Sequence, residues 1–403
     1  MIWPAKKLRY RAVHNAMKAS VAFTPFPVPE LYSGPGCVKK VPEAVKSKKI
    51  DNVLVVTDKD LMALGLLDGL LKSLEEEEIR YTLFDEVYPN PTIQNVEDGY
   101  DLYRDNKCKG IIAFGGGSPM DCAKIIAARV KRPRRSVKKL KGLFKILRIL
   151  PPIFAVPTTA GTGSETTIAA VISDPEEQEK FAIIDFSIVP RFAFLDPELM
   201  VSLPQHITST TGMDALTHAV ESYIGLHNTE LVKNNAEKAT RLIFENLEDV
   251  YEDGSDIVKR ENMAMASYYA GVAFTRASVG YVHAIAHNLG GLYGVPHGLA
   301  NAIILPYVLE ESREDAEKKI ANLAIEAKLG KHGDSPTELS ISFIERIKAM
   351  NKNMGIPDFV EELQEEDIPL IAKRALKEAN PLYPVPTILN QKSCEKLISR
   401  LLQ

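Results

Sequence analysis

KGIIAFGGGSPMDCAKIIAARV, residues 109–130, is a short apolar run that passes through three glycines into a longer stretch with helical spacing. The run at 110–114 has the length and the isoleucine content of a buried strand. Ser118 and Pro119 then suit the first turn of a helix, because serine caps helix starts and proline fits the first helical position. The segment predicts a strand joined to a helix by a tight glycine turn.

The same order of strand and helix recurs on both sides of this segment. NVLVVTD (52–58) precedes the helix-like LMALGLLDGLLKSLEEEE (61–78), and PIFAVPTT (152–159) precedes a second glycine-rich turn. Further strand-like runs are AAVISD (169–174) and FAFLDP (192–197). Strands that alternate with helices favour βαβ units and a parallel sheet.

The pattern changes from about Leu203 onward. Long helical periodicities dominate there, for example over 209–225, 232–253 and 260–274. Two prolines in LDPELMVSLPQHIT (195–208) mark the change. We therefore expect an α/β domain over residues 1–200 and an all-helical domain over residues 201–403.

The bulk composition excludes several classes of partner. The 403 residues carry a net charge of -4, which gives no strong positive field to hold nucleic acid. No run of eighteen apolar residues occurs, and the four cysteines show no CxxC spacing. We expect a soluble cytoplasmic protein with reduced thiols that binds neither nucleic acid nor a membrane. The basic run at 131–149 could attract an acidic partner, but a solvated loop is the interpretation that we favour.

Two glycine-rich turns are candidates for a phosphate site. At the first, Gly116 and Gly117 let backbone N–H groups approach an anion, and Ser118 opens a helix whose dipole favours negative charge. The second, PTTAGTGSE (157–165), offers threonine hydroxyls beside flexible glycines. Together they suggest a pyrophosphate held from two sides, although the first turn could also be a tight connection without a ligand.

Asp58 ends the strand-like run at 52–58. A carboxylate there can accept hydrogen bonds from a ribose diol and would repel a 2′-phosphate, which favours NAD over NADP. The alternative is an ordinary loop or cap residue.

Histidine and carboxylate spacing in the second half suggests a metal site. Asp214 and His218 are four residues apart, and so are His283 and His287, so each pair lies on one helical face. Two such pairs on facing helices could supply four ligands to a divalent cation. Spacing alone indicates these four residues, with helix-surface or core side chains as the alternative. No HExxH motif of zinc hydrolases is present.

At this point the sequence resembles the iron-containing (group III) alcohol dehydrogenases over nearly its whole length. The resemblance rests on PNPT (89–92), GGGSPMDCAK (115–124), PTTAGTGSE (157–165), GMDALTHAVE (212–221) and HAIAHNLGGLYGVPHG (283–298). It implies the fold shared with dehydroquinate synthase: an α/β NAD(P)-binding domain with a parallel sheet, followed by an all-helical domain that binds the metal and carries catalysis.

The resemblance revises the expected metal ligands. It implies Asp214, His218, His283 and His297, while His287 becomes a proton-relay residue that does not bind the metal. The glycines in NLGGLYGVPHG make this reasonable, because they break the helix and let His297 return to the metal.

The resemblance also implies cofactor and substrate residues. The cofactor set comprises Asp58, Gly116, Gly117, Ser118, Thr158, Thr159, Thr162, Lys180 and Leu199. The substrate-pocket set comprises Asn90, Ala169 and Phe274. Lactaldehyde reductases of the family look to have an asparagine where Ala169 stands here, so this chain favours a plain alcohol over a vicinal diol.

The implied activity is reversible, NAD-linked interconversion of a small primary alcohol and its aldehyde or ketone, with Fe²⁺ bound, or Zn²⁺ or another divalent cation in its place. The resemblance also implies a homodimer or a larger homo-oligomer, as is usual in the family. The alternatives are a glycerol dehydrogenase-like polyol oxidoreductase of the same fold, a metal-dependent hydrolase, and a nucleotide-binding protein without catalysis.

Overall fold

The computed structural model describes residues 3–177 and 179–403, which form two compact units. The α/β unit comprises residues 26–203 and 254–268. The helical unit comprises residues 3–25, 204–253 and 269–403. Each unit is described by itself below.

The α/β unit is built on a six-stranded sheet in which every paired strand is parallel to its neighbour. The strand order is β1 (Glu30–Ser33), β9 (Phe192–Leu195), β6 (Ile153–Pro157), β4 (Gly110–Gly115), β2 (Asn52–Val56) and β3 (Arg80–Phe84). The central strands β2, β4 and β6 are buried along their whole length. The predicted parallel sheet is confirmed.

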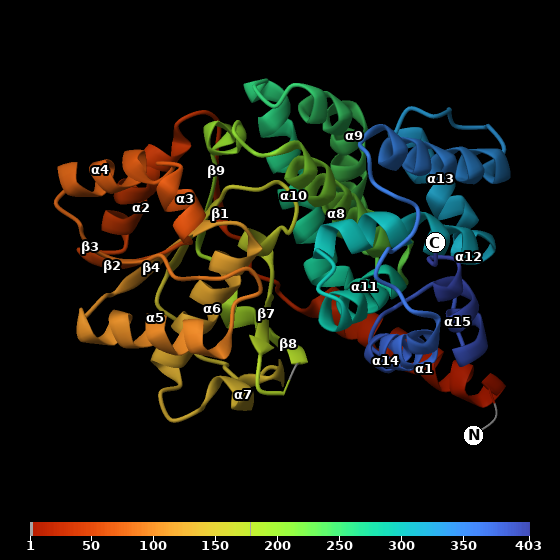
Figure 1. Cartoon of the computed structure of the whole chain (residues 1–403), viewed down its shortest axis with the longest axis horizontal. Helices are drawn as coiled ribbons and strands as arrows, with labels where there is room; N and C mark the ends of the chain where they lie inside the picture. Colours follow the sequence, from red (N-terminus) through yellow and green to blue (C-terminus); the bar gives the residue numbers. More distant parts are fainter. Residues whose placement is uncertain (1–2, 178) are drawn as a thin grey trace. The chain divides into compact units, whose positions relative to one another are not determined.

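Alternate residues of the central strands feed two separate cores. Leu54 and Val56 of β2 pack in the core that includes α5 (Ile93–Asp105) and α6 (Gly117–Lys131). Val53 and Val55 pack in the core that includes α2 (Val41–Ser47) and α4 (Asp68–Glu76). Figure 1 shows these helices on opposite sides of the sheet. Because helices cover both faces of the sheet, the strand sequences are continuous apolar runs.

A smaller sheet contains β5 (Gly142–Leu143), β8 (Glu179–Ile184) and β7 (Ala169–Asp174). The strand expected at 169–174 therefore forms, but it pairs antiparallel with β8 and lies outside the six-stranded sheet. The reason is local: the chain after β7 turns back at once and supplies β8 as a partner.

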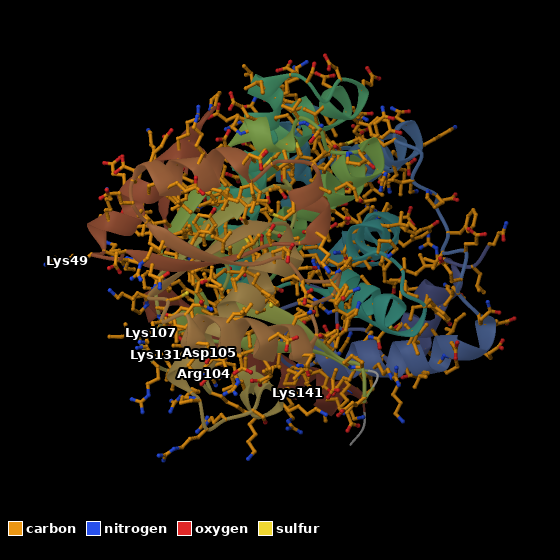
Figure 2. The ribbon with its side chains drawn as sticks, turned by 60° about the vertical axis from the view of Figure 1, so that its left-hand side comes forward. Lys49, Arg104, Asp105, Lys107, Lys131 and Lys141 are labelled. Atoms are coloured by element: carbon orange, nitrogen blue, oxygen red, sulfur yellow. The ribbon has the colours of Figure 1, made fainter. Side chains whose placement is uncertain are left out.

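The basic run at 131–149 folds against this smaller sheet. Lys138 pairs with Asp174 at 2.7 Å, and Lys141 pairs with Glu179 at 2.6 Å. Arg135 donates to the carbonyl of Lys145, within the run itself. Figure 2 shows Lys141 on the surface of this region. The run is thus not the plain solvated loop that we expected: it contains the short helix α7 (Val137–Leu140) and strand β5, and it buries Val137, Leu140 and Ile146. Several of its cations bind parts of the same unit.

The helical unit contains the long helices expected after Leu203. They are α8 (Gln205–Ile224), α9 (Glu230–Glu252), α11 (Tyr281–Leu292), α12 (His297–Glu326), α13 (Pro336–Asn353), α14 (Ile368–Ala379) and α15 (Gln391–Ser399). Helix α10 (Ile257–Ala277) has residues in both units. Every strand named in the described chain ends before residue 196.

The N-terminal helix α1 (Trp3–Phe23) groups with the helical unit, not with the α/β unit that follows it in sequence. Arg11 donates to the carbonyl of Val385 at 2.6 Å and also to that of Pro386. His227 lies 2.9 Å from the carbonyl of His14 through Nε2. The units therefore differ from a simple division at residue 200, because these contacts join residues far apart in sequence.

The described helices include none that is long and apolar enough to cross a membrane. Cys37, Cys108, Cys122 and Cys394 are all buried as free thiols.

Candidate metal centre and cofactor loops

Helix α8 carries three ionisable side chains on one face. Asp214, His218 and Glu221 follow one another at intervals of four and three residues, which places them side by side on a helix. Each is at most 5% exposed. Buried ionisable groups are tolerated when they are paired, hydrogen-bonded or bound to a metal, so this face marks a candidate site.

Helix α11 carries His283 and His287 one turn apart and ends at Leu292. Gly294 then takes a φ of +75°, a conformation that side-chain-bearing residues rarely adopt, and the chain turns there. Pro296 caps the next helix, so that His297 is the first residue of α12. The structure has the helix break and turn that the glycines predict.

The start of α12 lies directly against α8. A Cβ atom on Gly298 would lie 2.4 Å from the carbonyl oxygen of Thr210, so only glycine fits there. This close approach brings His297, the residue before it, towards the polar face of α8.

Three side chains from α8, α11 and α12 converge. Asp214 Oδ1 lies 3.7 Å from His283 Nε2 and 3.6 Å from His297 Nε2. The ligand atoms of these three residues all lie within 4.8 Å of one another. Metal–ligand bonds of about 2.0–2.2 Å place neighbouring ligand atoms roughly 3–4 Å apart, so the donor set fits a divalent cation.

His218 adjoins this trio. Its Nε2 lies 4.0 Å from Asp214 Oδ1. Its ring stacks between Phe274 at 4.0 Å and His283 at 4.6 Å, measured between centroids. Phe274, which was expected in the substrate pocket, thus contacts the expected ligand His218 directly.

Asn301 belongs to the same cluster and was not singled out in the sequence. It lies one turn after His297 on α12, and its Nδ2 donates to Asp214 Oδ1 at 2.7 Å. The same nitrogen lies 3.2 Å from His283 Nε2 and 3.1 Å from His297 Nε2. Asn301 could have been predicted from the sequence, because it follows His297 by four residues and therefore lies on the same face of one helix.

His287 lies beside the trio but makes a different set of contacts. Its Nδ1 is 2.7 Å from Glu378 Oε1 on α14, and Tyr383 donates to the same oxygen at 2.9 Å. Its ring lies 5.3 Å from that of His297. Spacing alone grouped His287 with His283, whereas the converging nitrogens belong to His283 and His297.

Burial sets the protonation of this region. It lowers the pKa of His283 well below its ordinary value, and neighbouring imidazoles act in the same direction. Burial also raises the pKa of Glu221 to about 7. A histidine that stays neutral keeps the lone pair that a metal ligand needs.

The two glycine-rich loops of the α/β unit lie against each other. A Cβ atom on Gly117 would lie 3.0 Å from Thr162 Cγ2, and one on Gly116 would lie 3.4 Å from Thr159 Oγ1. Gly116 is the N-cap of α6 and has no side chain to cap the first turn. The glycines at the start of α6 and the threonines of the second loop are therefore neighbours, an arrangement in which a pyrophosphate could be bound from two sides.

A buried polar network supports the second loop and was missed in the sequence. Lys124 is fully buried and donates to Ser164 Oγ and Thr167 Oγ1, both at 2.8 Å, and to the carbonyl of Ala169 at 2.9 Å. Burial lowers the pKa of Lys124 to about 8 and raises that of Glu165 to about 7. The network fixes the segment that follows Thr158, Thr159 and Thr162.

The remaining expected residues of this unit have structural contacts of their own. Asp58 caps α3 (Lys59–Ala63) by accepting from the backbone N–H of Leu61 at 2.9 Å. Lys180 donates to Asn90 Oδ1 at 3.0 Å, and the N–H of Asn90 donates to Ser118 Oγ at 3.2 Å. Asn90, expected at the substrate, thus contacts two residues of the expected cofactor set.

Two of the expected site residues, Leu199 and Ala169, have apolar side chains that make no hydrogen bonds. Leu199 is 8% exposed and packs in the core beneath the sheet. Ala169 is half-buried in β7, and its backbone carbonyl is the acceptor for Lys124.

Comparison with known proteins covers both units. The family model for iron-containing alcohol dehydrogenase matches residues 28–197, and that for the C-terminal part of the Fe-containing alcohol dehydrogenase family matches residues 208–402. A 1,3-propanediol dehydrogenase of Klebsiella pneumoniae is 40% identical over 353 residues, which are 87% of this chain and 91% of that protein.

Two further relatives extend the comparison. An NAD-dependent methanol dehydrogenase of Bacillus methanolicus is 36% identical over 86% of this chain and 91% of its own length. The crystal structure of a 1,3-propanediol oxidoreductase superposes with a TM-score of 0.90 at 37% identity, covering 94% of this chain and 99% of that one.

Proposed function

This chain belongs to the iron-containing alcohol dehydrogenase family, and we propose that it interconverts a small primary alcohol and its aldehyde at the metal centre of the helical unit. The observation that carries the proposal is the convergence of His283 and His297 on Asp214 Oδ1. His218 completes the ligand set from the same face of α8 as Asp214. Imidazole and carboxylate suit both Fe²⁺ and Zn²⁺, and membership of the family supports Fe²⁺.

The bound cation supplies Lewis acidity, which lowers the pKa of the substrate hydroxyl. Asp214 contributes the negative charge of the ligand set, and the neutral His283 contributes a lone pair. The His297 side chain is 41% exposed, whereas those of Asp214 and His283 are each 3% exposed. The substrate oxygen therefore reaches the centre from the side of His297.

His287 takes up the proton that leaves the alcohol. Glu378 accepts the hydrogen of Nδ1, so that Nε2 is the basic nitrogen of the ring. An imidazole titrates close to neutrality, which suits reversible proton transfer in both directions. The His287 and Glu378 side chains are 36% and 32% exposed, so the proton can pass on to solvent.

The α/β unit holds the dinucleotide, whose nicotinamide supplies the hydride acceptor. Gly116, Gly117 and Ser118 bind the pyrophosphate from the start of α6, with Thr158, Thr159 and Thr162 on the other side. Lys180 and Leu199 complete the site. Asp58 lies at the carboxyl end of β2, where it favours the ribose diol of NAD over the 2′-phosphate of NADP.

The substrate is a plain primary alcohol or aldehyde. Ala169 presents only a methyl group, which cannot hydrogen-bond a second hydroxyl next to the reacting one. Phe274 stacks on His218 and gives the centre an apolar wall. Asn90 offers a polar group, but its amide oxygen is already bound by Lys180.

We propose that the protein is cytoplasmic and forms a homodimer or a larger homo-oligomer. The four buried free thiols support a reducing compartment. The oligomer follows the family's habit.

The test is a substrate panel on protein reconstituted anaerobically with Fe²⁺ or Zn²⁺. Primary alcohols, 1,2-diols and glycerol are compared with NAD and NADP, and absorbance of the reduced nicotinamide is followed. We expect the highest kcat/KM with primary alcohols and NAD. Turnover of glycerol above all primary alcohols would contradict the proposed substrate. Failure to reduce NAD or NADP with every alcohol of the panel would contradict the proposed reaction.

A further inference from the structure

Glu221 is a buried carboxylate that the proposed mechanism does not use. It lies one turn after His218 on α8 and is 5% exposed. We propose that Glu221 is a positioning residue that fixes His283 as a metal ligand and anchors the start of α11. The inference rests on the proposed role of His283 as a ligand.

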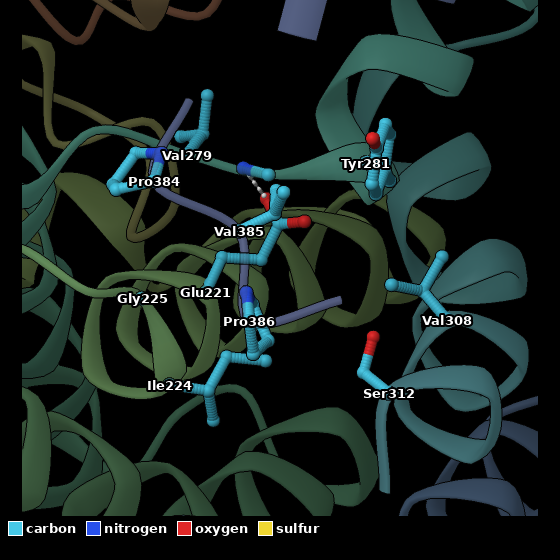
Figure 3. A pocket seen from close by; sticks show the side chains of 11 residues that line it. Glu221, Ile224, Gly225, Val279, Tyr281, Val308, Ser312, Pro384, Val385 and Pro386 are labelled. Atoms are coloured by element: carbon cyan, nitrogen blue, oxygen red, sulfur yellow. Dashed lines mark hydrogen bonds between the residues drawn. The ribbon is translucent and has the colours of Figure 1, made fainter. Parts of the chain in front are cut away.

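The carboxylate of Glu221 receives three hydrogen bonds from one short segment. The N–H of Gly280 donates to Oε2 at 2.7 Å, and the N–H of Val282 donates to Oε1 at 2.8 Å. His283 Nδ1 lies 2.7 Å from Oε2. Figure 3 shows Glu221 with the bond from the backbone nitrogen next to Val279. Helix starts leave backbone N–H groups without intrahelical partners, so Glu221 acts as the cap of α11 from another helix.

The same contacts determine which ring nitrogen of His283 faces the metal. Both oxygens of Glu221 already accept backbone N–H bonds, which favour the acceptor-only carboxylate against the effect of burial, so His283 donates through Nδ1. The lone pair then resides on Nε2, the nitrogen that lies 3.7 Å from Asp214 Oδ1. Metal-bound histidines commonly use their second nitrogen in this way, and the partner fixes the orientation of the ring.

The carboxylate of Glu221 lies directly against the backbone of Gly280. A Cβ atom on Gly280 would lie 2.6 Å from Glu221 Oε1 and 3.0 Å from its Cδ, so an alanine there would displace the carboxylate. Glu221 and Gly280 line a cavity of about 10 Å³ together with Val385 and Pro386 (Figure 3). Such a cavity has room for about one water.

The chain offers a matched control in Glu378. Glu221 and Glu378 each lie 2.7 Å from Nδ1 of a histidine on α11. The first contacts His283, a proposed ligand, and the second contacts His287, a proposed non-ligand. Replacing each glutamate by glutamine preserves size and removes the acceptor-only carboxylate.

The experiment measures Zn²⁺ affinity of metal-free protein by competition with a chromogenic chelator, together with the visible spectrum of the Co²⁺-substituted protein. We expect Glu221→Gln to weaken Zn²⁺ binding about 10- to 100-fold and to alter the Co²⁺ spectrum. Glu378→Gln is expected to bind Zn²⁺ within about twofold of the unchanged protein. Gly280→Ala, which pushes on the same carboxylate and leaves every ligand in place, is expected to resemble Glu221→Gln.

The outcomes separate the inference from the function on which it rests. Circular dichroism of each metal-free variant verifies folding, and Gly280→Ala decides the question if Glu221→Gln does not fold. A folded variant of either kind that binds Zn²⁺ as well as the unchanged protein overturns the role of Glu221. Equal losses in Glu221→Gln and Glu378→Gln would instead show that His287 is a ligand, which contradicts the proposed function.

Discussion

The imidazole of His287 lies parallel to that of His297, with 13° between the ring planes and 5.3 Å between the centroids. The two rings nevertheless point their nitrogens at different partners. His297 Nε2 faces Asp214, and His287 Nδ1 faces Glu378. Two adjacent histidines can therefore have different roles: His297 as a metal ligand and His287 as a proton acceptor.

His287→Ala tests this separation. We expect the variant to keep its metal, measured by elemental analysis, and to lose about 10²- to 10⁴-fold in kcat for alcohol oxidation. The loss should be largest at low pH, because hydroxide can accept the proton in place of the imidazole at high pH. Loss of bound metal in this variant would show that the ligand assignment is wrong.

Asp58 has two roles that substitutions can separate. Both Asp58→Ser and Asp58→Ala remove the negative charge, so each should improve the kcat/KM ratio of NADP to NAD by about tenfold or more, equivalent to about 1.4 kcal/mol. Only alanine also removes the cap of α3, which costs about 1 kcal/mol of unfolding free energy. An unchanged cofactor preference in both variants would leave Asp58 as a cap alone.

Glu165 should make the stability of the protein depend on pH. Its pKa is raised from 4.5 to about 7 by burial, so the folded state binds more protons than the unfolded state between these values. The unfolding free energy should therefore fall as the pH rises from about 4.5 to 7, by at most about 3 kcal/mol from this group.

Glu165→Gln is neutral at every pH and isolates this effect. The difference in unfolding free energy between the unchanged protein and the variant, measured by urea denaturation, should decrease across that range. The exposed Glu176→Gln serves as the control. A pH-independent difference for Glu165→Gln would mean that Glu165 is ionised in the folded protein.

Metal removal should destabilise the helical unit. Treatment with a chelator is expected to lower the melting temperature, and adding Fe²⁺ or Zn²⁺ should restore it, because a ligand that binds only the folded state adds about 4 kcal/mol at 1,000 times its Kd. Asp214→Asn should lose most of this metal-dependent shift. An equal shift in that variant, followed by calorimetry, would place the metal elsewhere.

Local patterns predicted much of the fold. Runs such as Asn52–Val56 and Gly110–Gly115 became buried parallel strands because both faces of the sheet are covered. Pairing was harder to predict: Ala169–Asp174 joined a hairpin with β8, a choice that depends on the chain that follows it. Helix α1 joined the helical unit through the partners of Arg11, which no local pattern near residue 11 reveals.

The candidate site shows the same limit. Spacing on one helix finds Asp214 with His218, but it cannot tell whether His287 or His297 reaches the metal, because that depends on where the turn at Gly294 directs the chain. Lys124 was missed since a lysine in the middle of a helix is normally exposed. Its burial became visible only with Ser164 and Thr167 folded around it.

The attachment of α1 imposes an order on synthesis. Arg11 and its acceptor Val385 are 374 positions apart, so α1 is synthesised long before the segment on which it docks. The α/β unit has all its residues once Tyr268 has emerged, whereas the helical unit also needs residues 269–403. A lone helix of 21 residues is marginal in water, so α1 spends that interval without its native support. Helix α1 is thus made before its docking site and reaches its final place only after that site has been synthesised.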